Sequence, residues 1–385
     1  MSAPHDPRFA PTNAPFQRDE QSVRFPTGSP VPVLRFHRVE AGQTVERFVP
    51  AVIGDRYHVD GVLSDAGGQG TIYVARDTTL MNRRCLVKAN KYTTAALQRA
   101  AAGSTQEVER QRESLVRECR FAVTMQRRGE GRVPNVLHLT HDLLPALLQH
   151  TRRAPRDLLA REPYVVMQYI PGLTLKDVIA EVTAGSLHGG LRSRRWWRAA
   201  LVFVRELASI LAVIHEAEEG DAGGRRCQVA HFYGDLKPDN CLVTGGEFLT
   251  LIDLGGVRRC WRPLDAGHDE GWASETDPVF TLGYVAPEMV DPGYAGELDP
   301  RVDLYSVGAL LFHMLTGQSP ARLAGASRAA PVLSASDPTL AGELPDYVRA
   351  LLSRALERDR ERRFESASEL KKATIDALQR LKRGE

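Results

Sequence analysis

The residues of this chain that could do chemistry gather in the stretch YGDLKPDN, residues 233–240. Two carboxylates, a lysine and an asparagine follow one another closely there, and a proline stiffens the segment. Another acid, Asp253, follows the apolar run LTLI, where a buried carboxylate must meet a cation or a hydrogen-bond donor. Asn240 and Asp253 offer the hard oxygen ligands that Mg²⁺ accepts. The two segments therefore predict a reaction site that uses a metal ion of this kind.

A glycine-rich turn nearer the N-terminus suits phosphate binding. In LSDAGGQGTIYVARD, Gly67, Gly68 and Gly70 lie between two expected strands, so backbone N–H groups could approach a phosphate without a side-chain clash. The strand-turn-strand context argues against a dinucleotide-binding fold, and the sequence contains no GxxxxGK[ST], which excludes a Walker-type loop. A plain glycine turn between strands is the ordinary alternative.

One expected hairpin later, Lys88 ends the apolar strand RCLVK. A lysine at a strand end is usually a solvated charge unless an acid can reach it. The expected helix ESLVRECRFAVTM offers Glu118 beside an apolar stripe, and such a pair could hold the ammonium on nucleotide phosphates. Glu118 is favoured because its apolar neighbours follow one helical face. The same helix pattern also carries three rival acids, Glu107, Glu109 and Glu113.

The composition is that of an ordinary globular protein. Of 385 residues, 43% are apolar and 25% are charged, and the formal net charge of +2 favours neither nucleic acid nor a membrane surface as a partner. The five cysteines are scattered without a CxxC pair, which indicates free thiols in a reducing compartment. Because the N-terminus lacks an apolar signal core and charges interrupt the longest apolar helix, we expect a cytoplasmic chain without a membrane segment.

Composition and periodicity divide the chain into three parts. Residues 1–50 are expected to be an N-terminal extension, largely disordered or extended, and the first 30 or so, rich in proline, are expected to be disordered. Residues 51–171 show strand patterns and one long helix pattern, interrupted near Gly103, with an insertion at about 142–163. Residues 172–385 contain a hairpin signal, GG, and are otherwise mostly helical. Helices are expected there near 173–184, 194–218, 301–317, 344–358 and 366–382.

In this order, the phosphate-cradling glycines, the strand lysine, the helix glutamate, D-x-K-x-x-N and D-x-G resemble the eukaryotic-like serine/threonine protein kinases of the bacterial, non-RD type. Later marks are similar too: TLGYVAPE contains A-P-E, DLYSVGALLFHMLTG looks like the helix that anchors the large lobe, and ERDRERRFESASEL looks like the closing motif. The resemblance runs from about Tyr57 to about Leu370. It implies an α+β, bilobal protein-kinase-like fold, with residues 51–171 as the small lobe and 172–385 as the larger, mostly helical lobe.

The resemblance implies a role for each of these residues. The catalytic residues would be Asp235, which accepts or orients the proton of the attacking hydroxyl, Lys237, which sits on the transferring γ-phosphoryl group, and Asn240. Asn240 and Asp253 would hold Mg²⁺, and Lys88 would contact the α- and β-phosphates of ATP. Further ATP-binding positions would be Gly67, Gly68, Gly70, Ile72, Glu118, Met167, Gln168, Tyr169, Ile170 and Leu242. The substrate groove would include Thr281, Gly283 and Glu288, and structural roles would fall to Asp303 and to Arg363, which would pair with Glu288.

Several positions depart from the family pattern. Asp65 stands where the first glycine of the phosphate loop is expected, so its carboxylate would repel phosphate, and Leu86 would crowd the adenine pocket. Tyr233 replaces a histidine and would fill the same position against Leu254, itself a replacement for phenylalanine. Gly234 stands where many kinases carry the arginine that binds an activation-segment phosphate. We therefore expect basal activity without phosphorylation of Ser274, Thr276 or Thr281.

Three function classes stay open: an active serine/threonine protein kinase, a pseudokinase that acts as a scaffold or nucleotide sensor, and a small-molecule kinase of the aminoglycoside-phosphotransferase kind. The A-P-E segment and the closing arginine disfavour the third class, and the retained lysine, catalytic acid and metal ligands disfavour the second. The expected partners are ATP, Mg²⁺ and protein substrates with Ser or Thr. Autoinhibition by the N-terminal extension is a hypothesis motivated by its place just before the small lobe.

Overall fold

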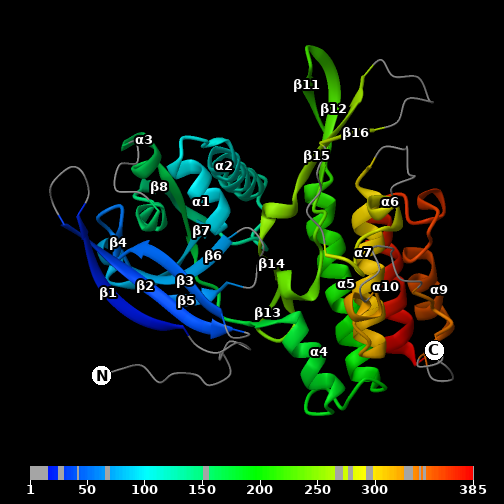
Figure 1. Ribbon diagram of the computed structural model, residues 1–385. Helices are drawn as coiled ribbons and strands as arrows, with labels where there is room; N and C mark the ends of the chain where they lie inside the picture. The colour runs from blue at the N-terminus through cyan, green and yellow to red at the C-terminus, as the bar shows by residue number, and fades with distance from the viewer. Residues whose placement is uncertain are drawn as a thin grey trace. The chain divides into compact units, whose positions relative to one another are not determined.

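The computed structural model describes residues 16–24, 30–40, 43–65, 70–150, 156–264, 272–275, 281–291, 298–324, 333–337, 340 and 344–384. The chain divides into two compact units, of which the first contains residues 1–124 and 134–170 and the second contains 125–133 and 171–385. The first is built on antiparallel sheets and the second mainly on helices, so the predicted α+β class is confirmed (Figure 1).

The first unit begins with a three-stranded antiparallel sheet. Its strands are β1 (Gln17–Arg24), β2 (Pro30–Glu40) and β3 (Gln43–Pro50), in that spatial order. Disorder was expected for the first 30 or so residues, yet Gln17–Arg24 pair with β2 along their whole length. The polar segment QRDEQSVR shows no apolar alternation, but Arg35 on β2 donates to Glu46 at 2.9 Å on one side and to Asp19 at 3.3 Å on the other. Cross-strand charge pairing of this kind stabilises an outer strand that has no apolar alternation.

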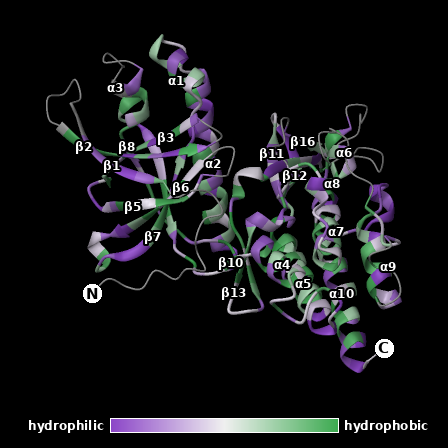
Figure 2. Cartoon of the chain, turned by 60° about the horizontal axis from the view of Figure 1, so that its bottom comes forward, coloured by the Kyte–Doolittle hydropathy of each residue, from purple (hydrophilic) through white to green (hydrophobic). Residues whose placement is uncertain are grey.

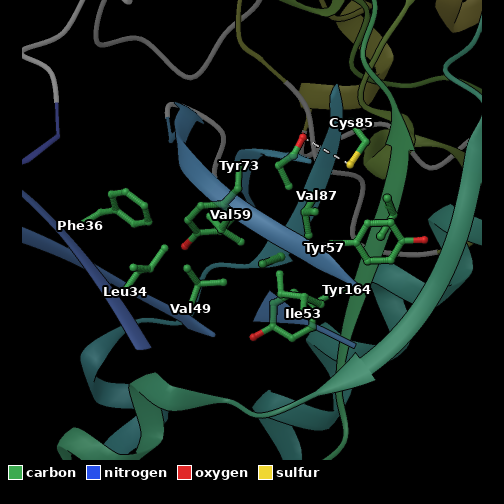
Figure 3. Packing of buried hydrophobic residues seen from close by; sticks show 13 residues of the cluster. Leu34, Phe36, Val49, Ile53, Tyr57, Val59, Tyr73, Cys85, Val87 and Tyr164 are labelled. Atoms are coloured by element: carbon green, nitrogen blue, oxygen red, sulfur yellow. Dashed lines mark hydrogen bonds between the residues drawn. The ribbon is translucent and has the colours of Figure 1, made fainter. Parts of the chain in front are cut away.

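A six-stranded antiparallel sheet follows, in the order β4-β5-β6-β7-β9-β8. Its strands are β4 (Val52–Ile53), β5 (Tyr57–Ser64), β6 (Gly70–Asp77), β7 (Arg83–Asn90), β9 (Glu162–Gln168) and β8 (Val136–Asp142). Leu34, Phe36 and Val49 of the first sheet share one buried cluster with Tyr73 and Val87 of the second (Figure 3). The N-terminal sheet is therefore part of the hydrophobic core of this unit.

Helices cover the other face of the six-stranded sheet. They are α1 (Thr94–Ala101), α2 (Gln106–Arg127) and the short α3 (Arg156–Leu159), and the interruption predicted near Gly103 is confirmed between the first two. On α2, Leu115 and Cys119 pack with Val165, the neighbour in sequence of Val166, which belongs to the cluster on the opposite face. The insertion contributes a 3₁₀ helix, Pro145–Gln149, and its leucines pack against α1 and the start of α2.

The second unit is organised around one buried helix. Its α-helices are α4 (Leu175–Thr183), α5 (Arg194–Ile214), α6 (Pro287–Val290), α7 (Arg301–Thr316), α8 (Pro320–Ala324), α9 (Asp346–Ala355) and α10 (Ala367–Arg383). Every residue of α7 from Val302 to Thr316 is buried, as expected for a helix at the centre of a bundle. Green and purple residues alternate along α10, which is amphipathic (Figure 2). In the described segments, no helix is long and apolar enough to cross a membrane.

Two small sheets position the loops of interest. One has the order β10-β13-β14, with β10 (Leu173–Thr174), β13 (Cys241–Thr244) and β14 (Phe248–Leu251), and it confirms the predicted GG hairpin. The other has the order β11-β12-β15-β16, with β11 (Glu218–Ala222), β12 (Arg225–Phe232), β15 (Arg258–Pro263) and β16 (Ala273–Ser274). Helix α5 was expected to reach residue 218 but ends at Ile214, and the chain turns into β11 instead.

Candidate active site

The stretch YGDLKPDN lies between β12 and β13 and ends in a 3₁₀ turn, Pro238–Asn240. Its side chains converge with one residue from a distant segment. Lys237 Nζ lies 2.7 Å from Asp235 Oδ2, and the hydroxyl of Thr281 donates to Asp235 Oδ1 at 2.7 Å. Lys237 Nζ also donates to Thr281 Oγ1 at 2.9 Å. Asp235, Lys237 and Thr281 thus form a closed triangle in which both carboxylate oxygens are held.

Asn240 connects this triangle to the segment that carries Asp253. Its side-chain Nδ2 donates to the backbone carbonyl of Asp235 at 2.9 Å, so the orientation of the amide is set and its oxygen is the side-chain atom that can act as a ligand or acceptor. The backbone carbonyl of Asn240 accepts a hydrogen bond from the N–H of Ile252 at 2.9 Å. The residue before Asp253 is therefore hydrogen-bonded to the stretch of residues 233–240. Asp253 has a φ of 65°, an uncommon value for a residue with a side chain.

The donor set of this segment fits Mg²⁺. Asn240 supplies an amide oxygen and Asp253 a carboxylate, both hard ligands, and Mg²⁺ in kinase-type sites completes its shell with water and substrate phosphates. Among the residues that the structure describes, no group of three or more His, Cys, Asp or Glu side chains could hold a metal by itself. A site built on two oxygen donors therefore matches a metal that arrives with a phosphate ligand and does not match a closed protein cage.

Two glycines let residues 233–240 and the Asp253 segment approach each other closely. Gly234 has a φ of +78°, and a Cβ there would lie 2.8 Å from the carbonyl oxygen of Gly256. A Cβ on Gly256 would in turn lie 2.8 Å from Asp235 Cβ. The backbone at position 234 is thus unsuited to any side chain, which explains why no arginine stands there.

Asp303 of α7 anchors the start of the stretch of residues 233–240. It is fully buried, and its carboxylate accepts the backbone N–H groups of Tyr233 at 2.6 Å and Gly234 at 2.9 Å. His215, which follows α5, lies 2.8 Å from the same carboxylate. The predicted structural residue therefore fixes two consecutive amides of the loop to the central helix.

The segment that follows Thr281 is tied to the helical core at two points. Gly283 has a φ of +98°, and a Cβ there would lie 2.4 Å from the backbone of Pro320, so only glycine fits. Glu288, at the start of α6, accepts two hydrogen bonds from the Arg363 guanidinium at 2.6 and 2.7 Å. Arg363 is 1% exposed, so this is a buried, bidentate ion pair.

The first unit holds the residues predicted to face the nucleotide phosphates. Lys88 Nζ on β7 lies 2.6 and 2.8 Å from the two carboxylate oxygens of Glu118 on α2. Gly70 leaves room for this lysine, because a Cβ at that position would lie 3.1 Å from Lys88 Cε. Of the rival acids, Glu107 pairs with Arg99 and Glu109 with Arg112. Gly67 and Gly68 lie outside the described residues.

Strand register places the other nucleotide-side residues. Ile72 is directly opposite Lys88, and Leu86 is opposite Met167, so these four side chains share one face of the sheet. Gln168 ends β9 and exchanges hydrogen bonds with Asn135, the backbone one at 2.8 Å. The Arg84 guanidinium lies over the ring of Tyr169, and Ile170 is the last residue of the first unit. Leu242, on β13, belongs to the second unit and is described only there.

Asp65 differs from the expectation that its carboxylate is free to repel phosphate. The side chain is buried, and it accepts two hydrogen bonds from Arg47 at 2.7 and 2.8 Å and one from the Thr71 hydroxyl at 2.8 Å. Burial raises the pKa of Asp65, but the hydrogen bonds and charge of Arg47, together with the Thr71 hydroxyl and the Lys91 charge, lower it by more, so the pKa lies below its usual value. Sequence analysis gave no role to Arg47, and no motif or spacing connects it with Asp65.

Comparison with known proteins agrees with this geometry. A family model described as "Protein kinase domain" matches residues 104–374. Serine/threonine-protein kinase PknJ of Mycobacterium tuberculosis is 27% identical over 333 residues, which cover 84% of this chain and 45% of PknJ. The probable serine/threonine-protein kinase PknB of Bifidobacterium longum is 26% identical over 337 residues, which cover 83% of this chain and 39% of that protein. The chain therefore spans less than half the length of these relatives. Because the family model covers well over half of its residues, this chain belongs to the protein kinase family.

Proposed function

We propose that this chain is a Mg²⁺-dependent protein kinase that transfers the γ-phosphoryl group of ATP to serine and threonine hydroxyl groups of proteins. The observation that carries the proposal is the triangle of Asp235, Lys237 and Thr281. It places a fixed carboxylate and a fixed ammonium side by side, as transfer to a hydroxyl requires. The names of the relatives, serine/threonine-protein kinases, agree with a lysine at position 237.

In this proposal each residue acts through the contacts already described. Asp235 accepts the proton of the substrate hydroxyl as it attacks, and Thr281 keeps the carboxylate oriented. Lys237 compensates the charge that spreads over the phosphoryl oxygens. Lys88, held by Glu118, contacts the α- and β-phosphates, and the glycine turn before β6 covers them. Asn240 and Asp253 would hold Mg²⁺, which would supply the positive charge that compensates the phosphate groups.

The proposal also assigns the parts of the chain. Residues 51–171, with the insertion at 142–163, act as the small lobe, and residues 172–385 act as the large lobe. Residues Met167, Gln168, Tyr169 and Ile170 form the connection that contacts adenine, together with Ile72 and Leu242. The N-terminal sheet is an addition to the small lobe, because its apolar side chains enter the core of the six-stranded sheet. All five cysteines are buried and form no disulfide, which suits a reducing compartment, and we assign the protein to the cytoplasm.

Activity without phosphorylation of the activation segment forms part of the proposal. The glycine at position 234 cannot receive a phosphate, and backbone pairing does part of the anchoring instead: Ser274 pairs with Cys260 and the N–H of Glu275 donates to the Arg259 carbonyl at 3.0 Å. Thr276 lies outside the described residues. Protein from which a phosphatase has removed all phosphate should therefore still transfer phosphate from ATP to its substrate. Turnover that appears only after phosphate is restored to Ser274, Thr276 or Thr281 would contradict this part.

One experiment separates the proposed activity from a pseudokinase and from a small-molecule kinase. Wild type and Asp235→Asn are incubated with Mg²⁺ and γ-labelled ATP, with and without a generic basic protein, and modified residues are located by mass spectrometry. We expect label on Ser and Thr with wild type only, and equal ATP binding by both proteins. Binding without transfer by the wild type would favour a pseudokinase. Transfer to an aminoglycoside but not to protein would favour the small-molecule class.

A further inference from the structure

The N-terminal sheet reaches the predicted phosphate turn through one side chain. Arg47, on β3, donates from Nε to Asp65 Oδ1 at 2.7 Å and from Nη2 to Asp65 Oδ2 at 2.8 Å. This fork-on-fork geometry is the strongest form of a charge-assisted pair, and Asp65 is 5% exposed. Arg47 precedes Tyr57, where the resemblance to the kinase family begins, and it belongs to none of the motifs that carry that resemblance.

Asp65 immediately precedes residues 66–69, which contain two of the three glycines proposed to bind phosphate. It follows the last residue of β5, and the hydroxyl of Thr71 on β6 donates to its Oδ1 at 2.8 Å. The carboxylate therefore joins the two strands on either side of residues 66–69, which lie outside the described residues. Lys91 adds a bond from Nζ to the Asp65 carbonyl at 2.8 Å and lies 3.4 Å from Oδ2.

The position of Arg47 is itself fixed by packing. The neighbouring core residue Val49 is fully buried, and Arg47 pairs in register with Phe36, which is 1% exposed and packs against Tyr73 at a ring-centroid distance of 5.8 Å. The guanidinium is thus delivered by a sheet that the core of the unit holds in place. An arginine so placed is preorganised, and its pairing with Asp65 costs little additional entropy.

We infer that Arg47 is a positioning residue for the nucleotide: through Asp65 it holds the end of β5 against the start of β6, and it compensates most of a negative charge that would otherwise act on the triphosphate. The inference rests on the proposed function. It explains how this chain has an acid at a position where the family has glycine, because the Arg47 guanidinium compensates the charge of the Asp65 carboxylate. Without Arg47 the carboxylate would keep only the more distant charges of Lys91 at 3.4 Å and Arg38 at 4.0 Å, and its remaining negative charge would weaken ATP binding, since charges inside a protein are screened less than in water.

A charge cycle tests the inference on the full-length chain. Equilibrium affinity for Mg·ATP is measured by calorimetry, and folding by thermal denaturation, for wild type, Arg47→Met, Asp65→Asn and the double variant. We expect Arg47→Met to weaken ATP roughly three- to tenfold, less at high salt. The double variant should return to within about twofold of wild type, because it removes the carboxylate as well. A purely structural role of the pair would not give this recovery of affinity.

Matched variants make the result decisive. Arg35→Met removes an arginine of the same sheet that pairs with Glu46 and Asp19, and it should leave ATP affinity unchanged. Arg47→Lys should keep most of the affinity, and Arg47→Gln, which can still donate to Asp65, replaces Arg47→Met if that variant does not fold. The inference alone would be overturned if Arg47→Met or Arg47→Gln left ATP affinity unchanged. It would also be overturned if the double variant lost as much ATP affinity as Arg47→Met. A wild type that binds no nucleotide would overturn the proposed function together with it.

Discussion

The hydroxyl of Tyr233 lies 2.8 Å from the backbone carbonyl oxygen of Asp253 and 2.7 Å from that of Ile252. The ring is fully buried, and its backbone N–H is held by Asp303. Tyr233 therefore connects the central helix to the backbone of the predicted metal ligand, whose φ of 65° is uncommon. The tyrosine that departs from the family's histidine provides a hydrogen bond as well as bulk.

Replacing Tyr233 with phenylalanine should lower turnover more than nucleotide affinity. The ring remains and fills its site, but two partly exposed carbonyl groups lose the hydroxyl donor that they share, at a cost of about 0.5–1.5 kcal/mol. Asp253 then loses one restraint on its backbone, and we expect kcat to fall roughly tenfold with a KM for ATP within about threefold of wild type. Initial rates and thermal denaturation check this. Wild-type kcat in a folded Tyr233→Phe protein would show that the hydroxyl has no positioning role.

The glycine at position 234 should be intolerant of any side chain. Gly234→Ala adds left-handed backbone strain and a contact of 2.8 Å with the Gly256 carbonyl, and it should destabilise the protein by about 2–4 kcal/mol. Gly246→Ala is the matched control, because Gly246 has a φ of +87° but no atom within 4 Å of a Cβ. Chemical denaturation of both variants measures the difference. Equal losses would mean that backbone strain alone, and not the close approach of the two loops, requires Gly234.

Breaking the pair between Arg363 and Glu288 should be costly. Arg363→Met leaves a buried carboxylate without its counter-charge, and we expect a loss of about 3–5 kcal/mol in the free energy of unfolding. The exposed pair of Arg226 and Glu219 supplies the comparison, since Arg226→Ala should cost less than about 1 kcal/mol. Urea denaturation of the two variants is the measurement. Similar losses of unfolding free energy in the two variants would show that the buried pair contributes no more to stability than the exposed pair.

The pair of Asp65 and Arg47 should make stability depend on pH in the acid range. The folded-state pKa of Asp65 is lowered because Arg47 outweighs the effect of burial, with Thr71 and Lys91 adding to it. A lowered pKa gives stabilisation that is complete above the unfolded-state value of about 3.9 and is lost as pH falls through the folded-state value. The Tm difference between wild type and Asp65→Asn should therefore be constant from pH 7 to about pH 5 and shrink below it. A Tm difference that grows as the pH falls would show that the folded-state pKa of Asp65 is raised and not lowered.

Removal of the N-terminal extension should destabilise the first unit and not release an inhibited enzyme. A chain that starts at Val52 lacks Leu34, Phe36 and Val49, each of which is at most 1% exposed. Burial of such side chains contributes roughly 1.5–3 kcal/mol each, so the truncated chain should lose several kcal/mol of stability and bind ATP more weakly. Thermal denaturation and calorimetry of the truncated chain test this. A stable truncated chain with raised turnover would instead support the autoinhibition hypothesis.

The sequence by itself determined the family, the α+β class and most of the local chemistry. Asp235, Lys237 and Asn240 stand within six positions, so a single loop and its 3₁₀ turn suffice to bring them together. Glu118 was favoured by one helical face, and the hairpin after β13 by two consecutive glycines. Each of these inferences depends on neighbours in the chain, whose geometry the backbone periodicities restrict.

Only the tertiary structure decided which distant residues meet. Arg47 is on β3, and Asp65, 18 residues later, follows β5 of the other sheet. The polar strand β1 is stabilised by charges on its neighbour and not by a pattern of its own. The Tyr233 hydroxyl finds carbonyl groups 19 and 20 residues away, and α5 ends early because the chain enters the sheet of β11 and β12. Such contacts depend on packing and on compensation of buried charge, and neither is encoded in local residue spacing.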